Sequence, residues 1–215
     1  MRRSVGLALL LVVAAGVAGA VEVRENRAPV GILLVTLDTT RADALGAYGG
    51  DAATPNLDRL AEAGVRYARA VAPAPLTLPA HATILSGLLP PEHGLRVNGH
   101  GRLPEGVETL ATRLRARGWS TAAVVGSRVL DARFGLARGF DHYEDRMPAE
   151  RIGQYGYPER GAEEVTDAAQ RWLGTRDPAT PVLLWVHYYD PHATYLDHGA
   201  AGPGERARYH SEVAH

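Results

Sequence analysis

The sequence predicts an α/β domain with a mostly parallel sheet flanked by helices. Two continuous apolar runs rich in branched residues, 30–37 and 182–186, have the composition of strands buried on both faces. Segments with apolar residues at helical spacing lie between them, and strands that alternate with helices are typical of a parallel sheet. At 215 residues and 46% hydrophobic, the chain is long enough for one domain with a substantial core.

The first 20 residues are expected to be a signal peptide. A basic start, MRRS, precedes the uninterrupted apolar run 5–21, and the small residues Ala18, Gly19 and Ala20 stand where a signal peptidase would cut. An uncleaved membrane anchor is the alternative, although the run is shorter than the roughly 20 residues that span a bilayer comfortably. Either outcome predicts an exported protein, periplasmic or extracellular, that contacts a membrane only if this segment is uncleaved.

Capping and turn residues define the elements of the folded part, 21–215. Thr54 and Pro55 predict a helix start, and Gly64 predicts its end. The other expected elements are, in order, a short strand at 65–71, a helix around 110–118, a strand at 121–125 and a helix over 165–173. Residues 126–161 are expected to be irregular, and the tail after residue 192 shows no clear core pattern.

Composition excludes several classes of site and partner. The formal net charge of −1 gives no electrostatic case for nucleic-acid binding. The absence of cysteine excludes disulfides, thiolate zinc sites, cysteine nucleophiles and lipid attachment through an N-terminal cysteine.

Polar residues directly follow the first and the last predicted strand. Asp38 follows the first, and His187, Asp190 and His192 follow the last. Ligands of open parallel sheets bind outside the carboxyl ends of the strands, so these side chains are expected at one edge. Asp and His suit a divalent cation and also proton transfer. Each residue also has a structural interpretation, Asp38 as a turn residue and His187 as a packed core histidine.

The stretch PLTLPAHATILSG places a hydroxyl at a predicted helix start. Thr77 precedes Pro79 and an apolar helix, so it could be a plain N-cap. A phosphoryl group bound there would gain from the free N–H groups and from the helix dipole. A cation on Asp38 could lower the pKa of the hydroxyl and activate it. The pair therefore predicts a metal ligand, Asp38, and a nucleophile, Thr77.

Several motifs carry a family resemblance. TPNLDRLAEAGV, SGLLPPEHG and LLWVHYYDPHATY, with the aspartate that ends the first strand, resemble the N-terminal half of sulfatases of the alkaline-phosphatase superfamily. The resemblance implies a metal-dependent ester hydrolase in which Asp38 and Thr77 hold the metal. It also implies that Thr77 is the nucleophile and that His192 contacts the transferred or leaving group, supported by His187 and Asp190.

The nucleophile loop departs from the sulfatase pattern. Sulfatases have Cys or Ser at this position, followed by Pro and Arg, and convert it to formylglycine; Thr77, Pro79 and His81 cannot follow that route. Thr39 also stands where sulfatases have a second aspartate ligand. The Thr-x-Pro-x-His loop resembles that of nucleotide pyrophosphatases/phosphodiesterases, and Asn98 matches the asparagine that holds phosphoryl oxygens in those enzymes.

The second metal-binding segment of the family is not recognisable. The DHG tripeptide 197–199 resembles it, but no apolar strand precedes it, so a loop coincidence is expected. We therefore expect residues 21–215 to be an incomplete sulfatase-like domain, not competent alone, whose remaining ligands follow His215. The expected cofactor is a divalent ion (Ca²⁺, Mn²⁺, Zn²⁺ or Mg²⁺), and the expected substrate is a small-molecule, glycan-linked or lipid-linked sulfate or phosphate ester.

Two alternatives stay open. An inactive fragment or binding module could retain the fold without the full site. A haloacid-dehalogenase-type phosphatase also has an aspartate after its first strand, but it needs a second aspartate where Thr40 stands.

Overall fold

A computed structural model describes residues 31–148, 158–199 and 202–215. The predicted signal peptide lies outside these ranges. Within them, no helix combines the length and the apolar character needed to cross a membrane.

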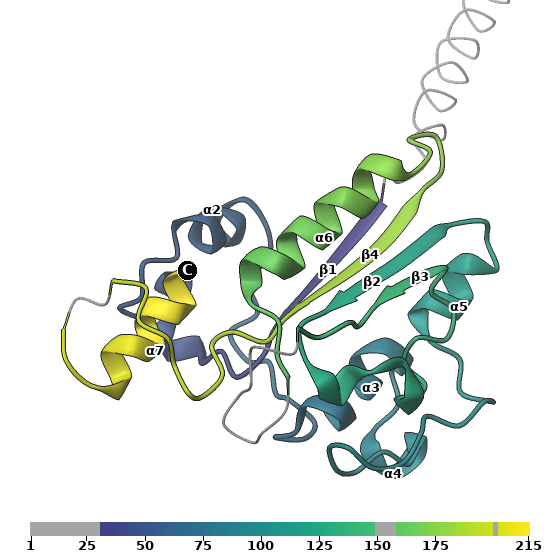
Figure 1. Ribbon diagram of the computed structural model, residues 1–215, viewed down its shortest axis with the longest axis horizontal. Coiled ribbons are helices and arrows are strands. Elements are labelled where there is room, and N and C mark those ends of the chain that lie inside the picture. Colours follow the sequence, from purple (N-terminus) through teal and green to yellow (C-terminus); the bar gives the residue numbers. More distant parts are fainter. Residues whose placement is uncertain (1–30, 149–157, 200–201) are drawn as a thin grey trace, which may run out of the picture.

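Four parallel strands form the sheet, in the order β1-β4-β2-β3 (Figure 1). Their bounds are Gly31–Leu37 (β1), Ser120–Val125 (β2), His142–Glu144 (β3) and Val182–Tyr188 (β4). The register places His187 opposite Thr36 on one side and Val125 on the other. The predicted α/β class with a parallel sheet is confirmed.

Helices cover both faces of the sheet and extend beyond its end. The α-helices are α2 (Pro55–Ala63), α3 (Thr77–Ser86), α4 (Pro90–His93), α5 (Leu110–Arg115), α6 (Ala162–Thr175) and α7 (Glu205–Ala214). The short 3-10 helices are η1 (Ala42–Ala44), η2 (Gly46–Tyr48), η3 (Arg128–Leu130) and η4 (Ala132–Phe134). Figure 1 shows α6 along one face, α3, α4 and α5 on the other side, and α2 and α7 together past the end of β1.

The core has two parts, one on each face of the sheet. Leu183 and Trp185 of β4 point into the larger cluster, which includes Leu78 of α3. Leu184 of β4 points into the smaller one, against Val165 of α6. Alternation along β4 therefore buries both of its faces, as predicted.

The expectation that the first strand is buried on both faces is wrong. In β1, Leu33 is 64% exposed and Val35 is 43% exposed. Both residues lie on the α6 face of the sheet, opposite Leu184 and Val186 of β4. β1 is the edge strand of the described sheet, and α6 packs on β2 and β4 rather than over β1.

Among the other elements, an expected helix is confirmed, an expected strand is not, and two elements were not expected. The helix expected from Pro55 to Gly64 is confirmed, but 65–71 is not a strand, and Val65 and Val71 are strongly exposed. The region 126–161 contains β3, and the tail contains α7. The three residues of β3 and the largely polar sequence of α7 present no clear apolar pattern.

Gly139 provides a test of the fold. Its φ is +92°, and a Cβ there would lie 2.3 Å from the backbone nitrogen of Thr112 in α5. We expect Gly139→Ala to lower the free energy of unfolding by about 2–4 kcal/mol, because strain and a backbone clash combine. Gly106→Ala is the matched control, since its Cβ would meet no atom within 4 Å. Equal urea midpoints for the two variants would contradict this packing.

Candidate active site

The site is organised around the carboxylate of Asp38, at the end of β1. The backbone N–H of Asp38 donates to the carbonyl of Tyr188 in β4 at 2.9 Å, which continues the strand pairing. The Thr77 hydroxyl donates to Asp38 Oδ2 at 2.8 Å, and His187 Nε2 lies 3.3 Å from the same oxygen. The ends of β1 and β4 and the start of α3 therefore meet at one carboxylate.

The surroundings of Asp38 favour its charged form. Burial raises the pKa of this carboxyl, but the hydrogen bond and charge of His187, the Thr77 hydroxyl and the charge of His81 lower it. The net effect holds the pKa of Asp38 below its ordinary value. The group is therefore an ionised carboxylate at neutral pH, able to accept hydrogen bonds or to bind a cation.

Helix α3 begins at Thr77 itself, so the hydroxyl does not serve as an N-cap. Leu76 occupies the cap position with extended φ and ψ, and no side chain caps the helix. Pro79 has no N–H, and the N–H of Ala80 donates to the Leu76 carbonyl at 3.1 Å. The N–H of Leu78 donates to Asn98 Oδ1 at 2.9 Å. This arrangement leaves the Thr77 N–H without an acceptor among the described residues.

Asn98 lies at the same helix end with a fixed amide orientation. Because its oxygen accepts the Leu78 N–H, its NH₂ group is left to donate. Asn98, Asp38, Thr77 and His192 all line one cavity of about 990 Å³. A cavity of this size holds a sugar-sized or aryl ligand.

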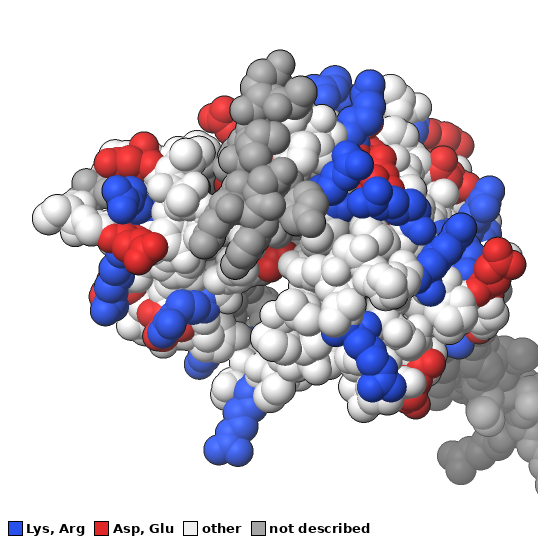
Figure 2. Space-filling model, turned by 60° about the horizontal axis from the view of Figure 1, so that its bottom comes forward, with Lys and Arg blue, Asp and Glu red and all other residues white. Residues whose placement is uncertain are grey.

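The face of the molecule seen in Figure 2 carries charges of both signs. Arginines are interspersed there with acidic residues, and uncharged surface lies between them. The formal net charge of −1 is also small, so no strong long-range field attracts or repels an anionic ligand.

The three predicted residues after β4 have different positions. His192 lines the cavity; its ring stacks on Tyr189 at 4.1 Å, with Nε2 2.9 Å from the Tyr189 hydroxyl and Nδ1 3.0 Å from the Ala193 carbonyl. His187 is fully buried behind Asp38 and is not on the cavity wall. Asp190 is also not among the described residues that line this cavity.

His81 belongs to the site more closely than its sequence position suggested. Its Nδ1 lies 2.7 Å from the Thr77 carbonyl, and its ring meets that of His187 at 4.7 Å. Burial lowers the pKa of His81 to about 4, so the imidazole is neutral. The signal in the sequence was the spacing of four from Thr77, which places both residues on one face of a helix.

Comparison with known proteins identifies the family. A family model described as Sulfatase matches residues 31–212. The chain belongs to the sulfatase family. It is 28% identical to N-acetylglucosamine-6-O-sulfatase of Bacteroides thetaiotaomicron over 80% of the chain and 32% of that relative. It is 34% identical to mouse steryl-sulfatase over 54% of the chain and 22% of that relative. It therefore spans a third or less of these curated relatives.

Solved structures share the fold of this sulfatase-family chain. A complex with the substrate D-glucosamine-2-N,6-O-disulfate has a TM-score of 0.65 at 27% identity, covering 77% of this chain and 35% of that one. The phosphonate monoester hydrolase of Agrobacterium radiobacter has a TM-score of 0.58 at 23% identity, covering 75% and 41%. At 23% identity, the similarity to the phosphonate monoester hydrolase shows a shared fold alone.

The donors for a cation are oxygen atoms. Asp38 offers a carboxylate and Thr77 a hydroxyl on the wall of the same cavity. Within the described ranges no group of three or more His, Cys, Asp or Glu side chains is placed to hold a metal ion. The pair fits one side of the shell of a hard cation, which usually takes about six or more oxygen ligands.

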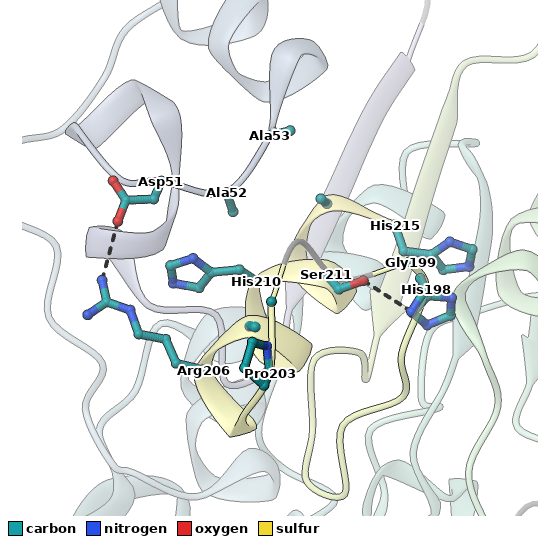
Figure 3. Close-up of a pocket in the computed structure, with 13 residues that line it drawn as sticks. Asp51, Ala52, Ala53, His198, Gly199, Pro203, Arg206, His210, Ser211 and His215 are labelled. Carbon is teal, nitrogen blue, oxygen red and sulfur yellow. Dashed lines mark hydrogen bonds and ion pairs between the residues drawn. The ribbon is translucent and has the colours of Figure 1, made fainter.

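A second cavity of about 800 Å³ lies between α7 and Asp51 (Figure 3). The rings of His198 and His215 stack there at 3.8 Å, and Arg206 pairs with Asp51 at 3.4 Å. It shares no described lining residue with the cavity at Asp38 and Thr77. The DHG tripeptide borders it as a loop turn, in which Asp197 Oδ1 accepts the Gly199 N–H at 2.9 Å.

The neutral, buried His81 makes stability depend on pH. The unfolded imidazole binds a proton below about 6.5, whereas the folded one does so only below about 4. Between these values the unfolded state binds more protons, so stability falls as the pH falls, by at most about 1.4 kcal/mol per pH unit. We expect His81→Asn, whose amide can still reach the Thr77 carbonyl, to flatten this slope in urea unfolding from pH 7 to pH 4.5. Parallel slopes in both proteins would contradict the assignment.

Proposed function

We propose that the protein hydrolyses sulfate or phosphate esters with a divalent cation and with Thr77 as the nucleophile. The observation that carries the proposal is the hydrogen bond from the Thr77 hydroxyl to the ionised Asp38, on the wall of a large cavity. Membership of the sulfatase family supports an ester hydrolase. Thr77 occupies the position of the nucleophile in the family resemblance.

The chemistry assigned to Thr77 is a displacement. Its oxygen forms a bond to phosphorus or sulfur, and the bond from that atom to the ester oxygen breaks, with the electron pair leaving on the alcohol. Asp38 accepts the hydroxyl hydrogen bond at 2.8 Å and orients the oxygen for attack, and the proton released from the hydroxyl passes to solvent. Water then cleaves the covalent threonine ester and restores the hydroxyl.

Members of the family generally use a divalent metal. Asp38 and Thr77 would hold it here, and it would lower the pKa of the hydroxyl and offset negative charge on the ester. Water and oxygens of the ester would fill the other positions. Carboxylate and hydroxyl donors favour Ca²⁺, Mg²⁺ or Mn²⁺ over a metal that prefers sulfur.

Two donors at the start of α3 would stabilise the transferred group. The NH₂ of Asn98 and the N–H of Thr77 are available beside the nucleophile, and the helix dipole adds to their effect. His192, on the wall of the same cavity, is our candidate for donating a proton to the leaving alcohol. His187 acts on Asp38 from behind and not on the ester.

Thr77 is the direct test of the proposed function. We expect Thr77→Ala to lower kcat by at least about a thousandfold, because it removes the nucleophilic oxygen at the start of α3, while Thr77→Ser retains measurable turnover. The loss of one hydrogen bond to a charged group should change the free energy of unfolding by only about 1–3 kcal/mol.

Thr83→Ala, six residues further along α3, controls for damage to the helix. Turnover that survives Thr77→Ala at the wild-type rate would refute the mechanism. A stable protein with no turnover towards any ester would favour the alternative of a binding module.

Phosphate esters are proposed ahead of sulfate esters. The nucleophile is a threonine, which cannot become formylglycine, and the loop with Asn98 matches that of phosphodiesterases. A phosphate monoester also carries more negative charge than a sulfate monoester, so a cation and N–H donors stabilise it more. Against this, the curated relatives named above are sulfatases, and one structural neighbour binds a disulfated sugar. The natural substrate would then be a small-molecule, glycan-linked or lipid-linked ester outside the cytoplasm.

Parallel kinetics decide between the two ester classes. With 4-nitrophenyl phosphate, bis(4-nitrophenyl) phosphate and 4-nitrophenyl sulfate as substrates, we expect kcat/KM to be at least about tenfold higher for a phosphate ester, equivalent to about 1.4 kcal/mol. Thr77→Ala run in parallel identifies turnover that comes from this site. A higher kcat/KM for the sulfate would reverse the assignment.

A further inference from the structure

The turn that follows Asp38 has an unusual backbone. Thr39 has φ +49°, in the left-handed region, and it is the one described non-glycine residue with positive φ. A β-branched residue rarely adopts this conformation, because its branched side chain crowds the backbone. Contacts from elsewhere in the protein must therefore hold the turn.

Those contacts come from residues about 150 to 170 positions further along the chain. The hydroxyl of Tyr209, in α7, accepts the Arg41 N–H at 2.8 Å and donates to the Thr39 carbonyl at 3.1 Å. The Thr39 hydroxyl donates to the carbonyl of Pro191. Tyr209 is buried, at 7% exposure, so its hydroxyl bonds with little competition from water.

We propose that Tyr209 is a positioning residue for Asp38. Its hydroxyl closes the turn from Thr39 to Arg41 by satisfying one backbone group at each end. Without it, Thr39 can relax towards negative φ, which rotates the peptide joining it to Asp38 and moves the carboxylate away from Thr77. The proposal rests on the proposed function in one respect, that Asp38 binds the cation.

Tyr209 does not need its hydroxyl to stay in place. Its ring packs edge-to-face on Tyr195 at 5.2 Å between centroids. Helix α7 is also fixed by Glu212, whose Oε1 accepts the Leu196 N–H at 2.8 Å. Tyr209→Phe therefore removes the two hydrogen bonds to the turn and keeps the packing of the helix.

The test is the affinity for Mn²⁺, measured on the intact protein without substrate by electron paramagnetic resonance of the free ion. We expect Tyr209→Phe to raise the Kd by roughly tenfold, the lower end of the effect of removing an outer-shell partner. Tyr195→Phe is the matched control, because the Tyr195 hydroxyl makes no hydrogen bond within the described ranges, and its Kd should equal that of the wild type. Thermal melting without metal reports any general loss of stability.

A second substitution separates positioning from stability. Gly adopts the left-handed region without strain and adds no ligand, so Thr39→Gly in the Tyr209→Phe background should recover most of the lost affinity. A Kd for Tyr209→Phe equal to that of the wild type, or a weaker Kd that Thr39→Gly fails to improve, would overturn the positioning role.

The variant Asp38→Asn distinguishes failure of the positioning role of Tyr209 from failure of the proposed function. If Asp38→Asn weakens Mn²⁺ binding while Tyr209→Phe does not, the cation site at Asp38 is supported and the positioning role of Tyr209 is refuted. If the wild type binds no Mn²⁺, or Asp38→Asn leaves the Kd unchanged, both proposals fall.

Discussion

The hydrogen bond between Thr77 and Asp38 is the contact on which the candidate site depends. It joins the end of a strand to the start of a helix 39 positions later, and it brings a hydroxyl to an ionised carboxylate. The sheet order makes this possible, because β4 lies next to β1 and brings His187 behind the same oxygen. Because the ionised Asp38 can only accept hydrogen bonds, Nε2 of His187, 3.3 Å away, is the donor in this contact.

The site also depends on buried aromatic rings at the cavity wall. His81, which lines the cavity, contacts His187 and Trp185, and the Trp185 indole N–H donates to the Thr36 hydroxyl at 3.0 Å. Low dielectric around these rings keeps His81 neutral and strengthens the hydrogen bonds to Asp38. A protonated His81 would add a buried positive charge beside the carboxylate and would compete with a cation for it.

Elements that depend on local sequence pattern could be predicted, whereas features that depend on tertiary contacts could not. β4 and the helix from Pro55 were readable from apolar runs and caps, and the strand ends and the helix start indicated Asp38, Thr77 and His192. Asn98, which lines the same cavity, was indicated only by the family resemblance. The exposure of β1 was not, since an apolar run has the same composition at an edge as at a centre. The roles of His81 and Tyr209 depend on burial and on contacts across about 170 positions, which no local window contains.

The position of β1 explains why distant contacts matter so much to Asp38. On one side the strand pairs with β4, and within the described ranges no strand pairs with its other side. A carboxylate at the end of such a strand is fixed less firmly than one at the end of a central strand, because half of the ladder is absent. The bonds from Tyr209 and Thr39 beyond the strand, and from Thr77 and His187 beside it, supply the missing constraint. Helix α7 thus stabilises the geometry of a site that its own side chains do not line, and its largely polar sequence is compatible with that role because one buried hydroxyl makes the contact.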